Sequence, residues 1–255
     1  MNSVFSADRF IKLLKYDLRT NLPKFYITFC MLCSIVPAFG IIAVAFGESI
    51  SLNARDFMYT ALLYVCSFVS PFVIYKHANN RKGGIYFITL PASAFEKFLS
   101  ILVVCSIIVP LAFIIANILL DYILSSTLFY VAYEKYVGLY GFRFSVWQDI
   151  FTLLRVIGFC ILGNLYFVSS KLSKTFFSGL GLLVIGSVFW GATGITYSII
   201  NELLFSVYYD AASRATEEWT RYENCLFVVR DITRVVLMLS FYLLAYLRIK
   251  KLQLK

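Results

Sequence analysis

Long apolar segments separated by short polar ones make up most of the chain. Six of these segments reach the length of about 20 residues that a helix needs to cross the hydrocarbon layer of a bilayer. The predicted membrane-spanning helices are Phe25–Phe46, Phe57–Tyr75, Phe98–Leu120, Ile150–Ser170, Thr175–Asn201 and Cys225–Leu247. The pattern predicts an all-α, polytopic membrane protein with six transmembrane helices, and it does not show the alternation of an outer-membrane barrel.

The segment before the first predicted span, residues 1–24, is basic and amphipathic. Its apolar residues recur every four positions with basic residues between them, as Phe10, Leu14 and Leu18 with Lys12, Lys15 and Arg19. We expect an interfacial helix that lies in the membrane plane with its lysines at anionic headgroups, and a solvated basic tail is the alternative. Pro23 is expected to end this helix, which leaves residues 25–255 as a single six-helix domain.

The net charge of +9 is distributed unevenly along the chain. Most of the 23 lysines and arginines fall in residues 9–24, 76–97, 171–174 and 248–255, whereas most of the 14 acidic residues fall in the other loops. An excess of basic residues marks the cytoplasmic side of a membrane protein, so both termini are predicted to be cytoplasmic. Because the charge follows this topology, we do not expect the chain to bind nucleic acid.

Proline and glycine mark where the predicted spans bend and pack. Pro37, Pro71 and Pro110 each fall inside one of the first three spans, where we expect kinks and carbonyl groups that neighbouring side chains satisfy. The fifth span is rich in glycine, which favours close helix packing, although a substrate path is the alternative. The short connection at residues 171–174 predicts a tight antiparallel hairpin of spans four and five.

Two predicted external segments are longer than a turn requires. Residues 121–149 are crowded with aromatic side chains, which is typical of an interfacial belt. Residues 202–224 carry charged residues at three- and four-residue spacings, which predicts a short external helix stabilised by ion pairs.

Ionisable residues inside the predicted spans are candidates for a function. They are Arg155 in span four and Arg230, Asp231 and Arg234 in span six. One interpretation is a polar lining or gate of a transport pathway, with Asp231 paired to Arg234. The other is that these side chains reach the outer headgroups. We expect no buried acid in the first five spans, which argues against a proton relay.

The motifs of most catalytic sites are missing from the sequence. It contains neither a G-x-x-x-x-G-K-[ST] phosphate loop nor H-E-x-x-H, and His77 is its only histidine. We therefore expect no enzyme activity, metal or cofactor in this chain. Asn117 and Asn164 are expected to form hydrogen bonds between helices. The six cysteines are expected to be small buried thiols rather than metal ligands: Cys30, Cys33, Cys66, Cys105, Cys160 and Cys225.

The segment between the second and third spans is the most informative one, and we call residues 81–97 the elbow. Gly83 and Gly84 interrupt the preceding helix, and a short apolar run follows from Ile85 to Leu90. Pro91 cannot continue that run as a helix. Ser93 and Glu96 then form a capping box, in which each side chain accepts a hydrogen bond from the backbone of the other. The apolar run is too short to span a membrane, so it lies in the interface or against a partner.

The capped elbow, the basic first helix and the six spans resemble the membrane subunits of type-2 ABC exporters. Within that family the chain looks most like small bacterial permeases of the Bacteroidetes type. The match to their LP-x-S-x-x-EK signature consists of Leu90, Pro91, Ser93, Glu96 and Lys97. Residues 10–23 are similar to the first helix of the family. Residues 121–149 depart from the family because this external loop is longer.

The resemblance implies a half-transporter in a bacterial plasma membrane. The elbow would dock on a separate cytoplasmic ABC ATPase, which holds ATP and magnesium, and a second permease, identical or not, would complete the pathway. The residues implied in ATPase coupling are Gly83, Gly84, Ile85, Phe87, Leu90, Pro91, Ser93, Glu96 and Lys97. The alternative function is a non-transporting membrane scaffold or sensor that anchors cytoplasmic partners. A membrane-embedded enzyme is least supported.

Overall fold

The computed structural model describes residues 5–46, 51–79, 87, 89–126, 148–187 and 212–253. Within these ranges the chain is helical apart from short turns and caps, and no strand occurs. The α-helices are α1 (Ala7–Tyr16), α2 (Tyr26–Phe46), α3 (Leu52–Ile74), α5 (Ala94–Val103), α6 (Val109–Ser126), α7 (Gln148–Tyr166) and α9 (Ala212–Gln253). A further helix covers residues 171–187.

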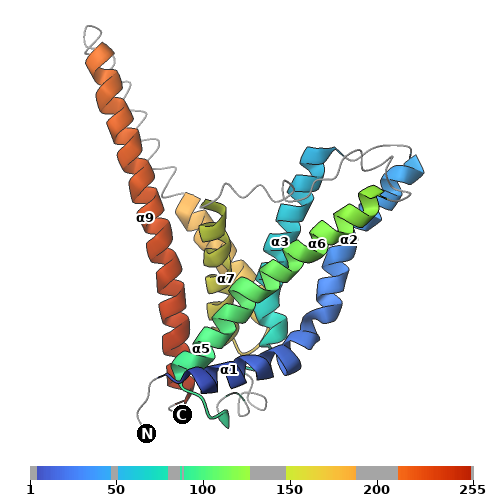
Figure 1. Cartoon of the computed structure of the whole chain (residues 1–255). Helices are drawn as coiled ribbons and strands as arrows, with labels where there is room; N and C mark the ends of the chain where they lie inside the picture. The colour runs from blue at the N-terminus through green and yellow to red at the C-terminus, as the bar shows by residue number, and fades with distance from the viewer. Residues whose placement is uncertain are drawn as a thin grey trace.

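Four helical stretches are long and apolar enough to cross a membrane, as in a membrane protein. They are Ala7–Ala43, Ala54–Ile74, Ala94–Leu124 and Ile232–Gln253, and α7 contributes a shorter apolar helix, Ile150–Tyr166. The fifth predicted span is described only over 171–187, so the prediction of six spans reaches beyond the described residues. Figure 1 shows α1 lying across one end of the bundle, close to the C-terminal end of α9. We call this end the base.

The prediction that Pro23 ends the first helix is wrong. The backbone passes from α1 through a π-helix, η1 (Asp17–Asn21), and a 3-10 helix, η2 (Leu22–Phe25), directly into α2. Pro23 stands at the start of η2, where its missing N–H costs no hydrogen bond. The change of helix type lets the chain turn from α1 into the steep α2 without a loop (Figure 1).

Pro71 in α3 bears on the prediction that neighbouring side chains satisfy the carbonyl groups that proline leaves free. Proline has no N–H for the carbonyl one turn earlier, which is that of Ser67. The Ser70 hydroxyl donates to this carbonyl at 3.2 Å, so the freed group is satisfied within the helix. The amide of Asn164 in α7 donates to the carbonyls of Pro71 (2.8 Å) and Tyr75 (3.1 Å), which confirms Asn164 as a hydrogen-bonder between helices.

The third predicted span is longer than expected at both ends. It begins with α5, passes through a π-helix, η3 (Val104–Ile108), directly before Pro110, and continues as α6 to Ser126. Asp121, which we had placed in an external loop, therefore lies within α6 and is only 1% exposed. Its carboxylate accepts from Arg55 Nη1 at 3.1 Å and from Tyr59 Oη at 2.8 Å, both on α3. The expectation of no buried acid in the first five spans is wrong.

The predicted hairpin is present, but its connection consists of residues 167–170, and residues 171–174 form the first turn of the next helix. Helix α7 ends at Tyr166 and the next helix begins at 171, with Ser170 in a left-handed conformation (φ 50°) between them. The two helices approach so closely that a Cβ on Gly163 would lie 2.2 Å from Oγ1 of Thr175. This position therefore requires glycine.

Helix α9 contradicts the expected short external helix. Part of the segment 202–224 belongs to it, because α9 runs without interruption over 42 residues from Ala212 to Gln253. At about 1.5 Å per residue its length is about 63 Å, twice the thickness of the hydrocarbon layer. Its N-terminal part therefore projects beyond the bundle, as Figure 1 shows.

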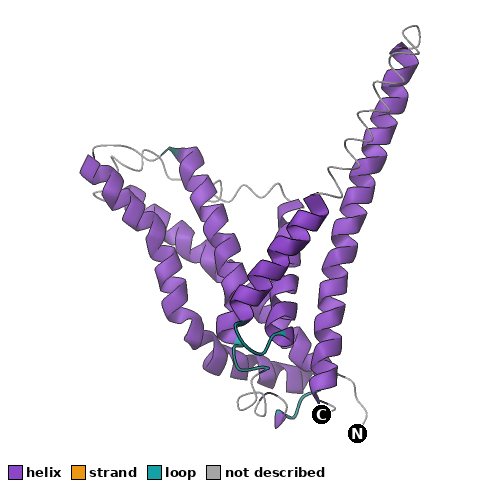
Figure 2. Ribbon diagram, turned by 180° about the vertical axis from the view of Figure 1, so that it is seen from behind, coloured by secondary structure: helices purple, strands orange, loops and turns teal. Residues whose placement is uncertain are grey.

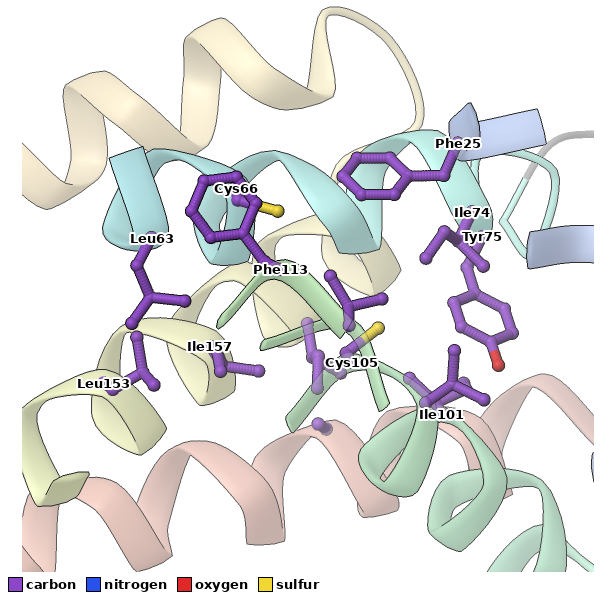
Figure 3. Packing of buried hydrophobic residues seen from close by; sticks show 14 of the residues in the cluster. Phe25, Leu63, Cys66, Ile74, Tyr75, Ile101, Cys105, Phe113, Leu153 and Ile157 are labelled. Carbon is purple, nitrogen blue, oxygen red and sulfur yellow. The ribbon is translucent and has the colours of Figure 1, made fainter. Parts of the chain in front are cut away.

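The apolar core joins helices from both halves of the chain. Figure 3 shows side chains of α3, α5, α6 and α7 meeting above α9, among them Leu63, Ile101, Phe113 and Ile157. Cys66 and Cys105 lie in this core as buried free thiols, as does Cys33, and Cys160 is buried as well. Cys30 is exposed, contrary to expectation, and Cys225 lies outside the residues whose side chains are described.

Candidate functional site

The described part of the elbow, residues 87 and 89–97, lies at the base of the bundle, at the same end as α1 and the C-terminal turns of α9 (Figure 2). Residues 87 and 89 are helical, and the chain then bends through Leu90, Pro91 and Ala92 into α5. Pro91 is exposed, and the Ala92 amide donates to the carbonyl of Leu90 at 2.7 Å. Gly83, Gly84 and Ile85, which we predicted to belong to the coupling loop, lie outside the described residues.

The predicted capping box is present at the start of α5. The Ser93 amide donates to Oε2 of Glu96 at 2.8 Å, and the Glu96 amide donates to Oγ of Ser93 at 3.2 Å. Both N–H groups belong to the first turn of a helix, where no backbone acceptor is available. The capping box therefore fixes the direction in which α5 leaves the elbow.

Glu96 also caps a second helix, which the sequence did not suggest. Its Oε1 accepts from the Ser6 amide at 2.7 Å and from Nη2 of Arg9 at 3.0 Å. Ser6 is the N-cap residue of α1, and its own side chain makes no capping bond. One fully buried carboxylate thus serves the N-termini of both α1 and α5, where negative charge is also favoured by the helix dipoles.

A second buried carboxylate, Asp17, makes the reciprocal contact. It belongs to η1, directly after α1, and accepts from the Ser100 hydroxyl of α5 at 2.5 Å. Tyr75 Oη, at the end of α3, donates to it at 3.1 Å, and Asn21 Nδ2 donates at 2.7 Å. Asp17 is 4% exposed, so three donors compensate for the water it loses.

The end of α9 completes this arrangement. The Gln253 side chain donates to the Ala92 carbonyl at 3.2 Å. The Tyr246 ring meets Phe95 and Phe98 of α5 edge to face, with ring centroids 6.3 and 6.0 Å apart. We call the contacts of Glu96, Asp17 and Gln253 the basal junction. It joins both terminal helices and the end of α3 to the elbow.

Lys97 lies inside the protein rather than on its surface. Its side chain is 1% exposed, and its ammonium group lies 5.5 Å from the ring centroid of Phe87. Neither Glu96 nor Lys97 is therefore placed to touch another protein. On the described part of the elbow, Thr89 and Pro91 are exposed and Leu90 is partly so.

The predicted polar group of spans four and six is brought together in part. Arg155 of α7 is half-buried, with Nη2 3.5 Å from Oγ1 of Thr152, and it lies near enough to Arg234 of α9 for their charges to repel one another. Arg230 and Asp231 belong to α9, but their side chains are outside the described set, so the predicted Asp231–Arg234 pair is not tested.

The buried pair of Arg55 and Asp121 is the polar contact within the spans that sequence reasoning missed. Both side chains are 2% exposed or less. The sequence does contain a signal for it: apolar residues follow Asp121 with helical spacing, which indicates that the helix continues beyond the aspartate. Such a pair joins α3 to α6 near the end opposite the base, and it is a structural contact rather than a catalytic one.

No group of three metal-ligating side chains occurs among the described residues. Comparison of the chain with protein-family models, curated proteins and solved structures finds no match.

Proposed function

We propose that the chain is the permease subunit of an ATP-driven ABC exporter, in which a separate cytoplasmic ATPase acts on the elbow. The observation that carries the proposal is the basal junction. The elbow is exposed at Pro91, while the elbow and the helix that follows it are held to α1 and α9 by partly buried hydrogen bonds. A displacement of the elbow would therefore move three helices together.

The remaining features of the proposal rest on charge distribution and on the family resemblance. The basic residues at the base favour a cytoplasmic location of this end, and with it of both termini, in a bacterial plasma membrane. The partners would be the ATPase, a second permease and the surrounding lipids. ATP and magnesium would be bound by the ATPase chain.

Co-purification tests the proposal. The full chain, extracted in mild detergent from its native membrane, is expected to bring down a phosphate-loop ATPase. Leu90→Asp places a charge on the partly exposed apolar residue of the elbow and should weaken that association at least about tenfold. Leu172→Asp is the matched control, since Leu172 is an exposed leucine outside the elbow, in the first turn of the helix that begins at residue 171.

Equal loss in both variants would show that no specific contact is made at the elbow. Both variants must elute as monodisperse protein, so that a folding defect is not mistaken for lost binding. If the chain retains partners but none is an ATPase, a scaffold or sensor function replaces the exporter. If ATPase binding is unchanged by Leu90→Asp, the elbow is not the docking element.

A further inference from the structure

A cavity of about 310 Å3 opens at the base beside the basal junction. It lies between the η1–η2 segment and the turn that follows α3, with the elbow as its third wall. Lys24, His77 and Asn21 line its polar side, and Ile74, Phe87 and Leu90 line its apolar side. The cavity is therefore lined by both basic and apolar side chains.

The cavity lies at the depth where two membrane-spanning helices end. The apolar stretch of α3 ends at Ile74, and α2 begins at Tyr26. Lys24, Lys76 and His77 are the first basic residues beyond these ends. In a bilayer this position coincides with the phosphate groups of one leaflet, where basic side chains meet anionic lipids.

The hydrogen bond that Lys24 makes at the edge of the cavity uses only part of its capacity as a donor. The exposed Lys24 ammonium donates to Oδ1 of Asn21 at 2.8 Å, which uses one of its three protons. The Asp17 carboxylate nearby is occupied by its own three donors inside the junction. Lys171 does not compete with Lys24 for an anion in the cavity, because its ammonium donates to the carbonyl of Lys76 at 2.7 Å. Burial, together with the charge of Lys76, lowers the pKa of Lys171 to about 8.

We propose that this cavity binds the headgroup of an anionic phospholipid, with its phosphate between Lys24 and His77. The volume is at the lower end of the range of about 300–1,000 Å3 for small-molecule sites, so it accommodates a headgroup and not a whole lipid. The apolar wall of Ile74, Phe87 and Leu90 receives the glycerol and the first acyl carbons. The bound lipid connects η2 to the elbow and so reinforces the basal junction.

A binding experiment on the full chain tests this site without any ATPase. The detergent-solubilised protein is titrated with short-chain phosphatidylglycerol, and native mass spectrometry gives the Kd. Lys24→Gln and His77→Gln are each expected to weaken binding at least about fivefold, because each removes a charge-assisted hydrogen bond to the phosphate. Lys12→Gln removes the same charge as Lys24→Gln from an exposed site on α1 outside the cavity and should change the Kd by less than about twofold.

Each outcome bears on the proposal. Saturable binding of phosphatidylglycerol that depends on Lys24 and His77, with weaker binding of short-chain phosphatidylcholine, supports it. Equal weakening by Lys12→Gln would show diffuse attraction to a basic surface and overturn it. Inorganic phosphate is added as a competitor: full displacement of the lipid at millimolar phosphate would assign the cavity to free phosphate and overturn the lipid assignment. The lipid-binding measurement does not depend on whether the chain is the subunit of an exporter, so the two proposals can fail separately.

Discussion

Removal of the Glu96 carboxylate is the sharpest test of the basal junction. In Glu96→Ala the amides of Ser6 and Ser93 lose their acceptor, and Arg9 loses its ion pair with Glu96. A hydrogen bond to a charged group contributes about 1.5–3 kcal/mol, so the two amides together account for about 3–6 kcal/mol, and the Ser6 amide, which is the one that belongs to α1, accounts for about half of this. The Arg9 side chain is 36% exposed, so its ion pair adds about 1 kcal/mol or less after screening by solvent.

Because the backbone hydrogen bond contributes more than the Arg9 ion pair, loss of Glu96 should weaken the docking of α1 more than loss of Arg9 does. Glu96→Ala should release the helix, and amide hydrogen exchange over residues 5–16 should accelerate about 10- to 100-fold, since 1.4 kcal/mol corresponds to a factor of ten. Arg9→Gln should accelerate the same amides only about three- to fivefold. Exchange is measured by mass spectrometry on the protein in nanodiscs, with residues 109–126 of α6 as the internal control.

The comparison of the two variants decides between the capping and ion-pair explanations. Equal acceleration in Arg9→Gln and Glu96→Ala would refute the assignment of most of the energy to the backbone amides. No acceleration in either would show that α1 is held by apolar contacts alone, such as that of the buried Leu13.

Two further pairs of variants test other parts of the structure. Arg55→Gln or Asp121→Asn removes one charge of the buried ion pair and should cost about 3–5 kcal/mol, seen as a lower midpoint of thermal unfolding, whereas the double replacement by leucine should recover most of that loss. Gly163→Ala places a methyl group against Thr175 and should destabilise the α7 hairpin by about 1–3 kcal/mol in the same assay. Gly181→Ala is its control, because a Cβ at Gly181 meets nothing within 4 Å, and a loss there equal to that of Gly163→Ala would contradict the packing explanation.

The parts of the structure that the sequence predicts correctly are local ones. The capping box of Ser93 and Glu96 spans one helical turn, so its partners can be read from adjacent residues. The hairpin of α7 and the next helix follows in the same way from a short connection, although this connection is residues 167–170 rather than 171–174. Helix α2 begins within a residue of its predicted start because its apolar pattern has a clear polar border.

The parts that the sequence does not predict depend on residues far apart in the chain. Glu96 and Ser6 are 90 positions apart, and Ser100 and Asp17 are 83 apart. The amphipathic or capping pattern of one helix does not indicate which backbone amide of a distant segment will donate to the same carboxylate. Asp121 was misplaced for a related reason: hydropathy ends a span at a charge, whereas a buried partner such as Arg55 allows the helix to continue.

The reciprocal placement of the two carboxylates determines which parts of the elbow region can move separately. Glu96 on α5 holds α1, and Asp17 at the end of α1 holds α5, so neither helix can separate from the other without exposing a buried charge. Beyond this block, the π-helix η3 and Pro110 replace regular α-helical hydrogen bonds within the same span. A force on the elbow is thus carried rigidly to Val103 and meets a weaker backbone only from Val104 onward. Two states of the protein in which α1 and α5 shift relative to each other, while η3 stays straight, would contradict this reasoning.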